Sequence, residues 1–322
     1  MLKYFNSNRI SIIIFISLFP AVYWIPSLFP SVSPQIPEVT GVPLGRLILA
    51  FNRDFRLLSS LVALILVIVN GYLLIELNTI YIFIPARTQL PSYFYGVLVM
   101  GMSQLHQLTP ALVSSTMLVL VFYRIFSAYK VERISLNFLD AGMLISLASL
   151  IYFPTLVFFL FLLASLIILR PFIWREWTFA VLGLIIPYIF LISVYFLADI
   201  SFAGYFTEIA DSLNKVEQHF KLSQVINWSF VLVFMLIGSY YMASAIDKMK
   251  IHASKFFFVY LFFFLFSVII YMVIPGSGLG MIFFVSIPLA YLFSYYFVRC
   301  RRNWVNEILF LLFLMLLLWQ RI

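Results

Sequence analysis

Residues 139–177, LDAGMLISLASLIYFPTLVFFLFLLASLIILRPFIWREW, decide the fold class of this chain. The stretch is apolar from Asp140 to Leu169 and is interrupted near Pro154. A bilayer core is about 30 Å thick and takes about 20 residues of helix, so this run is too long for one span and short for two. Because proline interrupts helical hydrogen bonding, Pro154 predicts two short helices that meet at the far side of the membrane.

The segment that follows this run is positively charged and aromatic, and it predicts an orientation. Arg170 and Arg175 place the near side in the cytoplasm, and Trp174 and Trp177 are expected at the level of the lipid headgroups. Most of the 20 lysine and arginine residues of the chain fall in loops assigned to the same side. We therefore expect a cytoplasmic N-terminus, since positive loops stay inside.

The composition is that of a polytopic membrane protein. Of the 322 residues, 64% are hydrophobic and 10% are charged, whereas soluble domains carry about 25% charged residues. The apolar runs predict an all-α transmembrane helical bundle of about 10–11 spans, and residues 1–322 form a single integral membrane domain. The net charge of +8 lies in short loops between these runs, which indicates membrane topology and not binding to nucleic acid.

Two further segments have amphipathic helical patterns and are expected outside the cytoplasm. In residues 44–58 the apolar side chains form one stripe, and Arg46, Arg53 and Arg56 lie opposite. This pattern predicts a helix in the membrane interface whose cationic face meets headgroups or water. In residues 199–221 a second apolar stripe and oppositely charged pairs four residues apart predict another interfacial helix.

The first of these helices carries the candidate site. Arginine binds phosphate through its bidentate fork, so Arg46, Arg53 and Arg56 are candidates for a lipid-linked phosphate. Asp54 lies at the edge of the two faces, and Glu38 precedes the helix. Either carboxylate could act as the general base of a catalytic site. The alternative interpretation is a helix that only anchors the fold, which is a common role of interfacial helices.

The remaining polar residues offer weaker candidates, of which Glu76 and His106 could couple a transporter to protons or ions. Glu76, Arg124 and Asp140 lie near the ends of spans, where charged side chains can reach the interface. His106 has no second histidine or carboxylate at metal-ligand spacing, so we expect no metal site. Cys300 is the only cysteine and cannot form an internal disulfide. No nucleotide or cofactor motif is present, and no cofactor is expected.

Three stretches carry a resemblance to a family of uncharacterised polytopic inner-membrane proteins of Bacteroidota-type bacteria: residues 7–9 (SNR), 87–91 (RTQLP) and 140–177. The resemblance covers most of residues 1–200. It implies a multi-pass protein of the bacterial inner, cytoplasmic membrane, and it implies no particular activity.

A fainter resemblance is to GT-C-type glycosyltransferases, which use polyprenyl-phosphate-linked sugars. Residues 141–169 look like their central helix pair, and residues 90–95 (LPSYFY) look like one of their helix starts. These enzymes carry an acidic residue in the first outer loop beside a juxtamembrane helix, which implies a catalytic role for Glu38 or Asp54. The chain departs from their pattern in having no Asp-Glu pair in that loop.

Three functional hypotheses follow. The protein is an envelope enzyme that handles polyprenyl-phosphate-linked sugars on the outer face, with membrane lipids and the sugar carrier as its partners. Alternatively it is a non-catalytic subunit that binds another protein of an envelope assembly. In the third hypothesis the protein is a secondary transporter, because prolines are expected to interrupt its spans and discontinuous helices are common in transporters. The prolines are Pro110, Pro154, Pro187 and Pro288.

Overall fold

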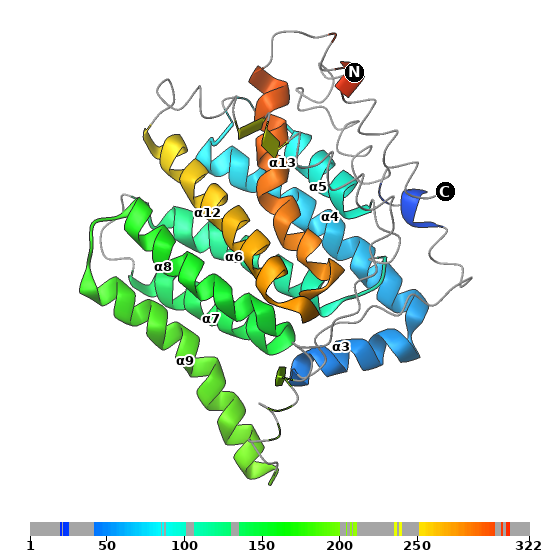
Figure 1. Ribbon diagram of the computed structural model, residues 1–322, viewed down its shortest axis with the longest axis vertical. Helices are drawn as coiled ribbons and strands as arrows, with labels where there is room; N and C mark the ends of the chain where they lie inside the picture. Colours follow the sequence, from blue (N-terminus) through cyan, green and yellow to red (C-terminus); the bar gives the residue numbers. More distant parts are fainter. Residues whose placement is uncertain are drawn as a thin grey trace.

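A computed structural model describes residues 42–84, 88–100, 106–129, 135–199 and 251–299, together with single residues and short pieces at 20, 22–25, 86, 204, 207, 209–210, 235–236, 238–239, 304 and 307–309. The predicted helix at 199–221 lies for the most part outside the described residues, and Glu38 lies wholly outside them. Within the described ranges every regular element is helical and none is a strand. The predicted all-α class is therefore confirmed (Figure 1).

The described elements are nine helices and three short 3-10 turns. In chain order they are α3 (Pro43–Asp54), α4 (Arg56–Tyr81), α5 (Leu90–Met100), α6 (Pro110–Ser127), α7 (Ser135–Ile151), η2 (Phe153–Val157), α8 (Phe158–Leu169), α9 (Trp174–Leu197), α12 (Ile251–Val273), η4 (Pro275–Ser277), η5 (Leu279–Met281) and α13 (Ile282–Arg299).

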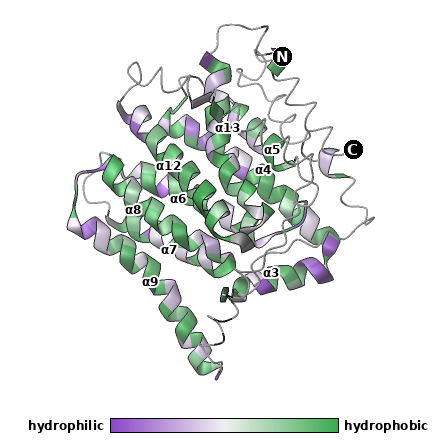
Figure 2. Ribbon diagram, in the orientation of Figure 1, coloured by the Kyte–Doolittle hydropathy of each residue, from purple (hydrophilic) through white to green (hydrophobic). Residues whose placement is uncertain are grey.

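Five of the described helices are long and apolar enough to cross a membrane. They are Arg56–Tyr81, Pro110–Ser127, Trp174–Leu197, His252–Val273 and Leu279–Arg299. Figure 2 shows apolar residues along these helices and hydrophilic residues at their ends and on α3. The protein is therefore a helical membrane protein. The predicted total of about 10–11 spans also uses residues beyond the described ranges and stays a prediction.

The helices pack around α13, which is almost completely buried. It contacts α5 on one side and α12 on another, and α4 packs against α5 and α6 (Figure 1). On the other side of α6, α7 lies between α6 and α9. Aromatic rings fill the centre, where Phe122 lies against Tyr260 with ring centroids 4.8 Å apart and Phe158 lies against Phe263 at 4.7 Å. Each such pair stabilises the fold by about 0.5–1.5 kcal/mol beyond the area it buries.

The break predicted near Pro154 is confirmed. α7 ends at Ile151, η2 contains Pro154, and α8 then runs for 12 residues to Leu169. At 1.5 Å per residue α8 is roughly 18 Å long, less than a bilayer core. The chain turns at Arg170, whose backbone is extended, before α9 begins at Trp174.

Two glycines allow α7 and α9 to approach closely. A Cβ atom on Gly183 would lie 2.2 Å from the carbonyl oxygen of Leu139, and one on Gly142 would lie 2.4 Å from that of Ala180. Because both neighbours are backbone atoms, they cannot move aside as a flexible side chain would. Small residues at such crossings are the usual means of packing helices in membranes.

The amphipathic helix predicted at residues 44–58 is confirmed as far as Asp54, and its predicted end was wrong, because residues 56–58 belong to the next helix. α3 ends at Asp54, Phe55 has the non-helical angles φ −127° and ψ 59°, and α4 begins at Arg56. The apolar stripe continues through Phe55. A periodic pattern of apolar residues cannot reveal a single non-helical residue within it, so the break was not predicted. Arg56 therefore belongs to the membrane-spanning α4 and not to the amphipathic helix.

Candidate functional site

α3 is attached to the rest of the bundle along one face. Gly45, Ile48 and Asn52 follow the three- and four-residue spacing of a helix face. Gly45 is buried against the end of α7, where an added Cβ atom would lie 2.5 Å from the carbonyl oxygen of Ile151. Ile48 packs against the hydrophobic core. The sequence predicted this helix, and the structure adds that it is closely packed onto protein.

The cationic side of α3 faces away from the bundle. Arg46 and Arg53 are both exposed, and they lie on the same side of the helix roughly 10 Å apart along its axis. A third face is apolar and exposed, with Leu44 at 37% and Leu47 at 66%. α3 thus has one face against protein, one apolar face suited to acyl chains, and one cationic face suited to headgroups.

The remaining described candidates for the site, Asp54 and Arg56, do not lie on the cationic face of α3. Asp54 is exposed at the last residue of α3, directly after Arg53. Arg56 is half-buried in the first turn of α4, so the three arginines do not form one face. Among the described residues no group of three or more His, Cys, Asp or Glu side chains could hold a metal ion.

A set of neutral polar side chains, which we call the polar junction, connects α3 to α4 and to the segment before α6. It comprises Asn52, Ser59, Ser60, His106 and Gln107. The Nδ2 of Asn52 donates to the Oε1 of Gln107 at 3.1 Å, and the hydroxyl of Ser59 donates to the Oδ1 of Asn52 at 2.7 Å. The same hydroxyl accepts from the backbone N–H of Leu108 at 3.1 Å.

The second half of the polar junction is buried beneath Trp24. The indole Nε1 donates to the backbone oxygen and the hydroxyl of Ser60, at 3.1 and 2.9 Å. The Ser60 hydroxyl in turn donates to the backbone oxygen of His106 at 2.9 Å. The imidazole stacks on the indole with ring centroids 4.2 Å apart, and its Nε2 lies 3.2 Å from the carbonyl oxygen of Met100. His106 is thus a buried packing residue, whereas its position at the end of an apolar run favours an interfacial one.

The roles of Asn52, Ser59 and Gln107 were not predicted from the sequence. Polarity was a signal only for the Ser59-Ser60 pair, which interrupts an apolar segment, because Asn52 stands among charged residues of an amphipathic helix. Polar side chains in such segments usually hydrogen-bond to a neighbouring helix. Their partner could not be named, because Asn52 and Gln107 are 55 residues apart.

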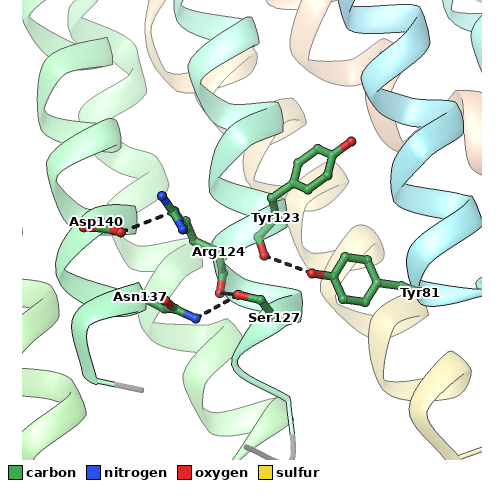
Figure 3. A network of polar contacts seen from close by, with 6 residues as sticks. All are labelled: Tyr81, Tyr123, Arg124, Ser127, Asn137 and Asp140. Atoms are coloured by element: carbon green, nitrogen blue, oxygen red, sulfur yellow. Dashed lines mark hydrogen bonds and ion pairs between the residues drawn. The ribbon is translucent and has the colours of Figure 1, made fainter. Parts of the chain in front are cut away.

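The end of the bundle opposite α3 holds a second polar network (Figure 3). The Nε of Arg124 on α6 lies 3.3 Å from the Oδ2 of Asp140 on α7, and about half of each side chain is exposed. Beside this pair the Nδ2 of Asn137 donates to the hydroxyl of Ser127 at 2.8 Å. Both contacts join the last turns of α6 to the first turns of α7.

Tyrosines extend this network to α4. The Tyr123 hydroxyl lies 2.7 Å from the backbone oxygen of Leu73 and 3.1 Å from a carboxylate oxygen of Glu76. The Tyr81 hydroxyl donates to the backbone oxygen of Tyr123 at 3.3 Å (Figure 3). Glu76, a candidate from the sequence, is thereby a partner in helix packing.

A buried ion pair lies at the turn between α8 and α9. A guanidinium nitrogen of Arg170 contacts the Oε1 of Glu176, whose side chain is only 6% exposed. The other carboxylate oxygen of Glu176 is buried and has no hydrogen-bond partner among the described residues. Close by, the Nζ of Lys255 donates to the backbone oxygen of Leu169 at 3.4 Å. These contacts hold α8, α9 and α12 together at this end.

One polar contact lies deep within the helices. The Nδ2 of Asn70 on α4 donates to the Tyr95 hydroxyl on α5 at 3.1 Å, and both residues are fully buried. The Oδ1 of Asn70 has no hydrogen-bond partner within the part of the chain that the structure describes. Such a group inside the span of a membrane helix is costly and points to a functional or water-binding role.

Comparison with known proteins assigns the chain to a family and gives no activity. Residues 35–322 match the model of a family of unknown function, DUF6427. No curated protein and no solved structure matches the chain. Since the family model covers most of the sequence, including α3, the polar junction and both ion pairs, the chain belongs to the DUF6427 family of unknown function.

Proposed function

We propose that this protein is a multi-pass protein of the bacterial inner membrane that binds a polyprenyl-phosphate-linked sugar at α3, on the outer face of the membrane. The observation that carries the proposal is the arrangement of α3. One face is packed onto the bundle, and Arg46 and Arg53 are exposed on another. A helix that is held in this way presents its guanidinium groups with little further loss of freedom on binding.

The chemistry of the ligand follows from the side chains of α3. Guanidinium groups favour phosphate because their planar fork matches two phosphate oxygens. The exposed Leu47 lies about a quarter turn around α3 from Arg46, and Leu44 lies further round the same apolar face, along which a polyprenyl chain would enter the membrane. A lipid-linked phosphate has both the charge and the apolar chain that these two faces suit.

The distribution of charge supports an orientation with α3 outside and a cytoplasmic N-terminus. The opposite end of the bundle carries more basic side chains than the three arginines of residues 46–56, and positive charge favours the cytoplasmic side. These side chains are Arg124, Arg170, Arg175, Lys255 and Arg299.

The faint resemblance to GT-C-type glycosyltransferases supplies a reaction for Asp54. The carboxylate would accept the proton of an acceptor hydroxyl as that oxygen bonds to the sugar C1. The bond between C1 and the phosphate oxygen would break at the same time, and its electron pair would leave with the polyprenyl phosphate. Arg53 is adjacent in sequence and would stabilise the charge that develops on this leaving group.

The test is a profile of lipid-linked sugars in cells by mass spectrometry. Cells that lack the protein and cells with the double variant Arg46→Gln/Arg53→Gln should accumulate the same polyprenyl-linked sugar. Arg175→Gln is the matched control, because it removes an exposed arginine from the opposite end. An unchanged profile in the deletion and the double variant would overturn the proposal.

Asp54→Asn tests the catalytic part separately. Accumulation in this variant, with the protein still present at its normal level in the membrane, supports transfer chemistry at Asp54. If only the double arginine variant accumulates the lipid, then the phosphate binds at α3 and Asp54 is not the base.

A second candidate, a secondary transporter, is favoured by the buried contact between Asn70 and Tyr95. The Oδ1 of Asn70, which has no hydrogen-bond partner among the described residues, lies within the bundle beside α5. Transporters place polar side chains and interrupted helices at such positions. Solute flux into proteoliposomes that is lost in Asn70→Leu would support this function over the first, and the absence of flux would exclude it for the solutes tried.

A further inference from the structure

The covalent connection between α3 and α4 does not by itself determine where the cationic face points. Phe55 is the single non-helical residue between the two helices. Since only its two backbone dihedrals separate them, a change at this residue would swing or rotate α3 relative to α4. Contacts elsewhere must therefore fix the direction of Arg46 and Arg53.

Asn52 supplies such contacts on both sides of the connection. Its Oδ1 accepts from Ser59, four residues after the break, and its Nδ2 donates to Gln107 before α6. Successive residues of a helix are about 100° apart around its axis. With Asn52 directed into the bundle, Arg53 and Arg46 must face outward, and a rotation by one residue would turn Arg53 toward Gln107.

The partner segment of Asn52 is itself firmly held. Ser59 accepts from the backbone of Leu108, and Ser60 donates to the backbone of His106. Trp24 and Ser60 are fully buried, and His106 is 3% exposed. Buried polar networks in which each member is hydrogen-bonded specify one arrangement of the elements they join.

We propose that Asn52 and Ser59 are positioning residues that hold α3 in the one orientation in which Arg46 and Arg53 face the lipid phosphate. This role rests on the proposed function for its ligand, and the orientation itself does not. Neither residue touches the phosphate. The alternative is that the polar junction only provides hydrogen bonds for buried polar groups. Its loss would then lower stability and leave the orientation of α3 unchanged.

The test measures the orientation of α3 in the full-length protein in lipid nanodiscs. Spin labels are attached through Ala50→Cys on the exposed side of α3 and Thr79→Cys near the far end of α4, in a Cys300→Ser background. Double electron–electron resonance then gives the distribution of distances between the labels. The variants are Asn52→Leu and Ser59→Ala. The control is Ser165→Ala, which removes a buried hydroxyl bonded only within its own helix.

The protein with the intact junction and the Ser165→Ala control should give one narrow distribution, and Asn52→Leu should give a broad or displaced one. Ser59→Ala, which removes a single hydroxyl, provides a second test should Asn52→Leu fail to fold. An unchanged distribution in a folded junction variant overturns the inference, whatever happens to lipid binding.

Binding of polyprenyl phosphate to the same nanodiscs is the second readout. Asn52→Leu should bind polyprenyl phosphate about tenfold more weakly. This is the loss expected when a misdirected arginine no longer makes one charge-assisted hydrogen bond to the phosphate. If the distribution broadens and binding is unchanged, Asn52 does not position the arginines for this ligand. If the unaltered protein binds no polyprenyl phosphate, the proposed function fails, and the distances still report whether the junction orients α3.

Discussion

Arginines at the two ends of the bundle have different surroundings. At the end opposite α3, Arg124 and Arg170 each form an ion pair with a carboxylate. On α3, Arg46 and Arg53 are exposed, and no described carboxylate forms an ion pair with Arg53. Where a carboxylate lies opposite, the arginine joins elements of the fold. Where the helix is already held by neutral groups, the arginine can bind a ligand.

The neutral side chains at the α3 end make this difference possible. Asn52, Ser59 and Ser60 perform there the connecting role that ion pairs perform at the other end. Neutral hydrogen bonds attach Asn52 of the helix to α4 and to the segment before α6. The comparison therefore predicts that loss of an arginine affects stability at one end and ligand binding at the other.

The largest effect on stability is expected from Glu176→Leu. This change leaves the guanidinium of the buried Arg170 without its carboxylate, and breaking a buried pair costs about 3–5 kcal/mol of unfolding free energy. Reversible unfolding in mixed detergent micelles measures the loss. The double variant Arg170→Leu/Glu176→Leu should recover most of it, because both charges are then absent. If the Glu176→Leu protein were as stable as the unaltered one, the ion pair would not stabilise the fold at this end, and the proposed difference between the two ends would be contradicted.

Gly45→Ala tests the attachment of α3 without changing any charge. The new methyl group would lie 2.5 Å from the carbonyl oxygen of Ile151, so α3 must move away from α7. We expect a loss of about 1–2 kcal/mol, since overpacking is partly offset by the helix preference of alanine. The same unfolding measurement should show almost no change for Gly204→Ala, where an added Cβ atom meets nothing within 4 Å. Equal stability of the two variants would argue that α3 is loosely attached.

The smallest effect is expected from the exposed pair of Arg124 and Asp140. About half of each side chain is exposed, so water screens their attraction. A double-mutant cycle with Arg124→Gln and Asp140→Asn should give a coupling of at most about 1 kcal/mol. A coupling as large as that expected for Arg170 and Glu176 would show that exposure does not distinguish the two pairs.

The sequence predicts much of this fold because long apolar runs and prolines dominate it. The break at Pro154 occurs where proline predicts it. The interruptions expected at the other prolines were wrong, because Pro110 begins α6 and the helices α9 and α13 continue through Pro187 and Pro288.

The sequence also predicts a span over residues 92–108, and its far end was wrong, because residues 106–109 are not helical. α5 is described as far as Met100, and residues 101–105 lie outside the described part. Apolar composition identifies a buried segment but does not separate a short buried helix from a full span.

The candidate site was predictable only in part. Amphipathic spacing located Arg46, Arg53 and Asp54 on an exposed helix. It also assigned Arg56 to the same face, because no local pattern marks the turn at Phe55. The contact of Asn52 with Gln107 depends on how distant segments pack, and nothing in either local sequence specifies it.

The most direct test of the central claim is the binding of polyprenyl phosphate to purified protein in nanodiscs, measured by native mass spectrometry. The double variant Arg46→Gln/Arg53→Gln should bind at least about tenfold more weakly than the unaltered protein, while Arg175→Gln binds normally. Phosphatidylglycerol should compete poorly in each case. Equal binding by the three proteins, or equal preference for phosphatidylglycerol, would contradict the account and leave α3 as an interfacial anchor.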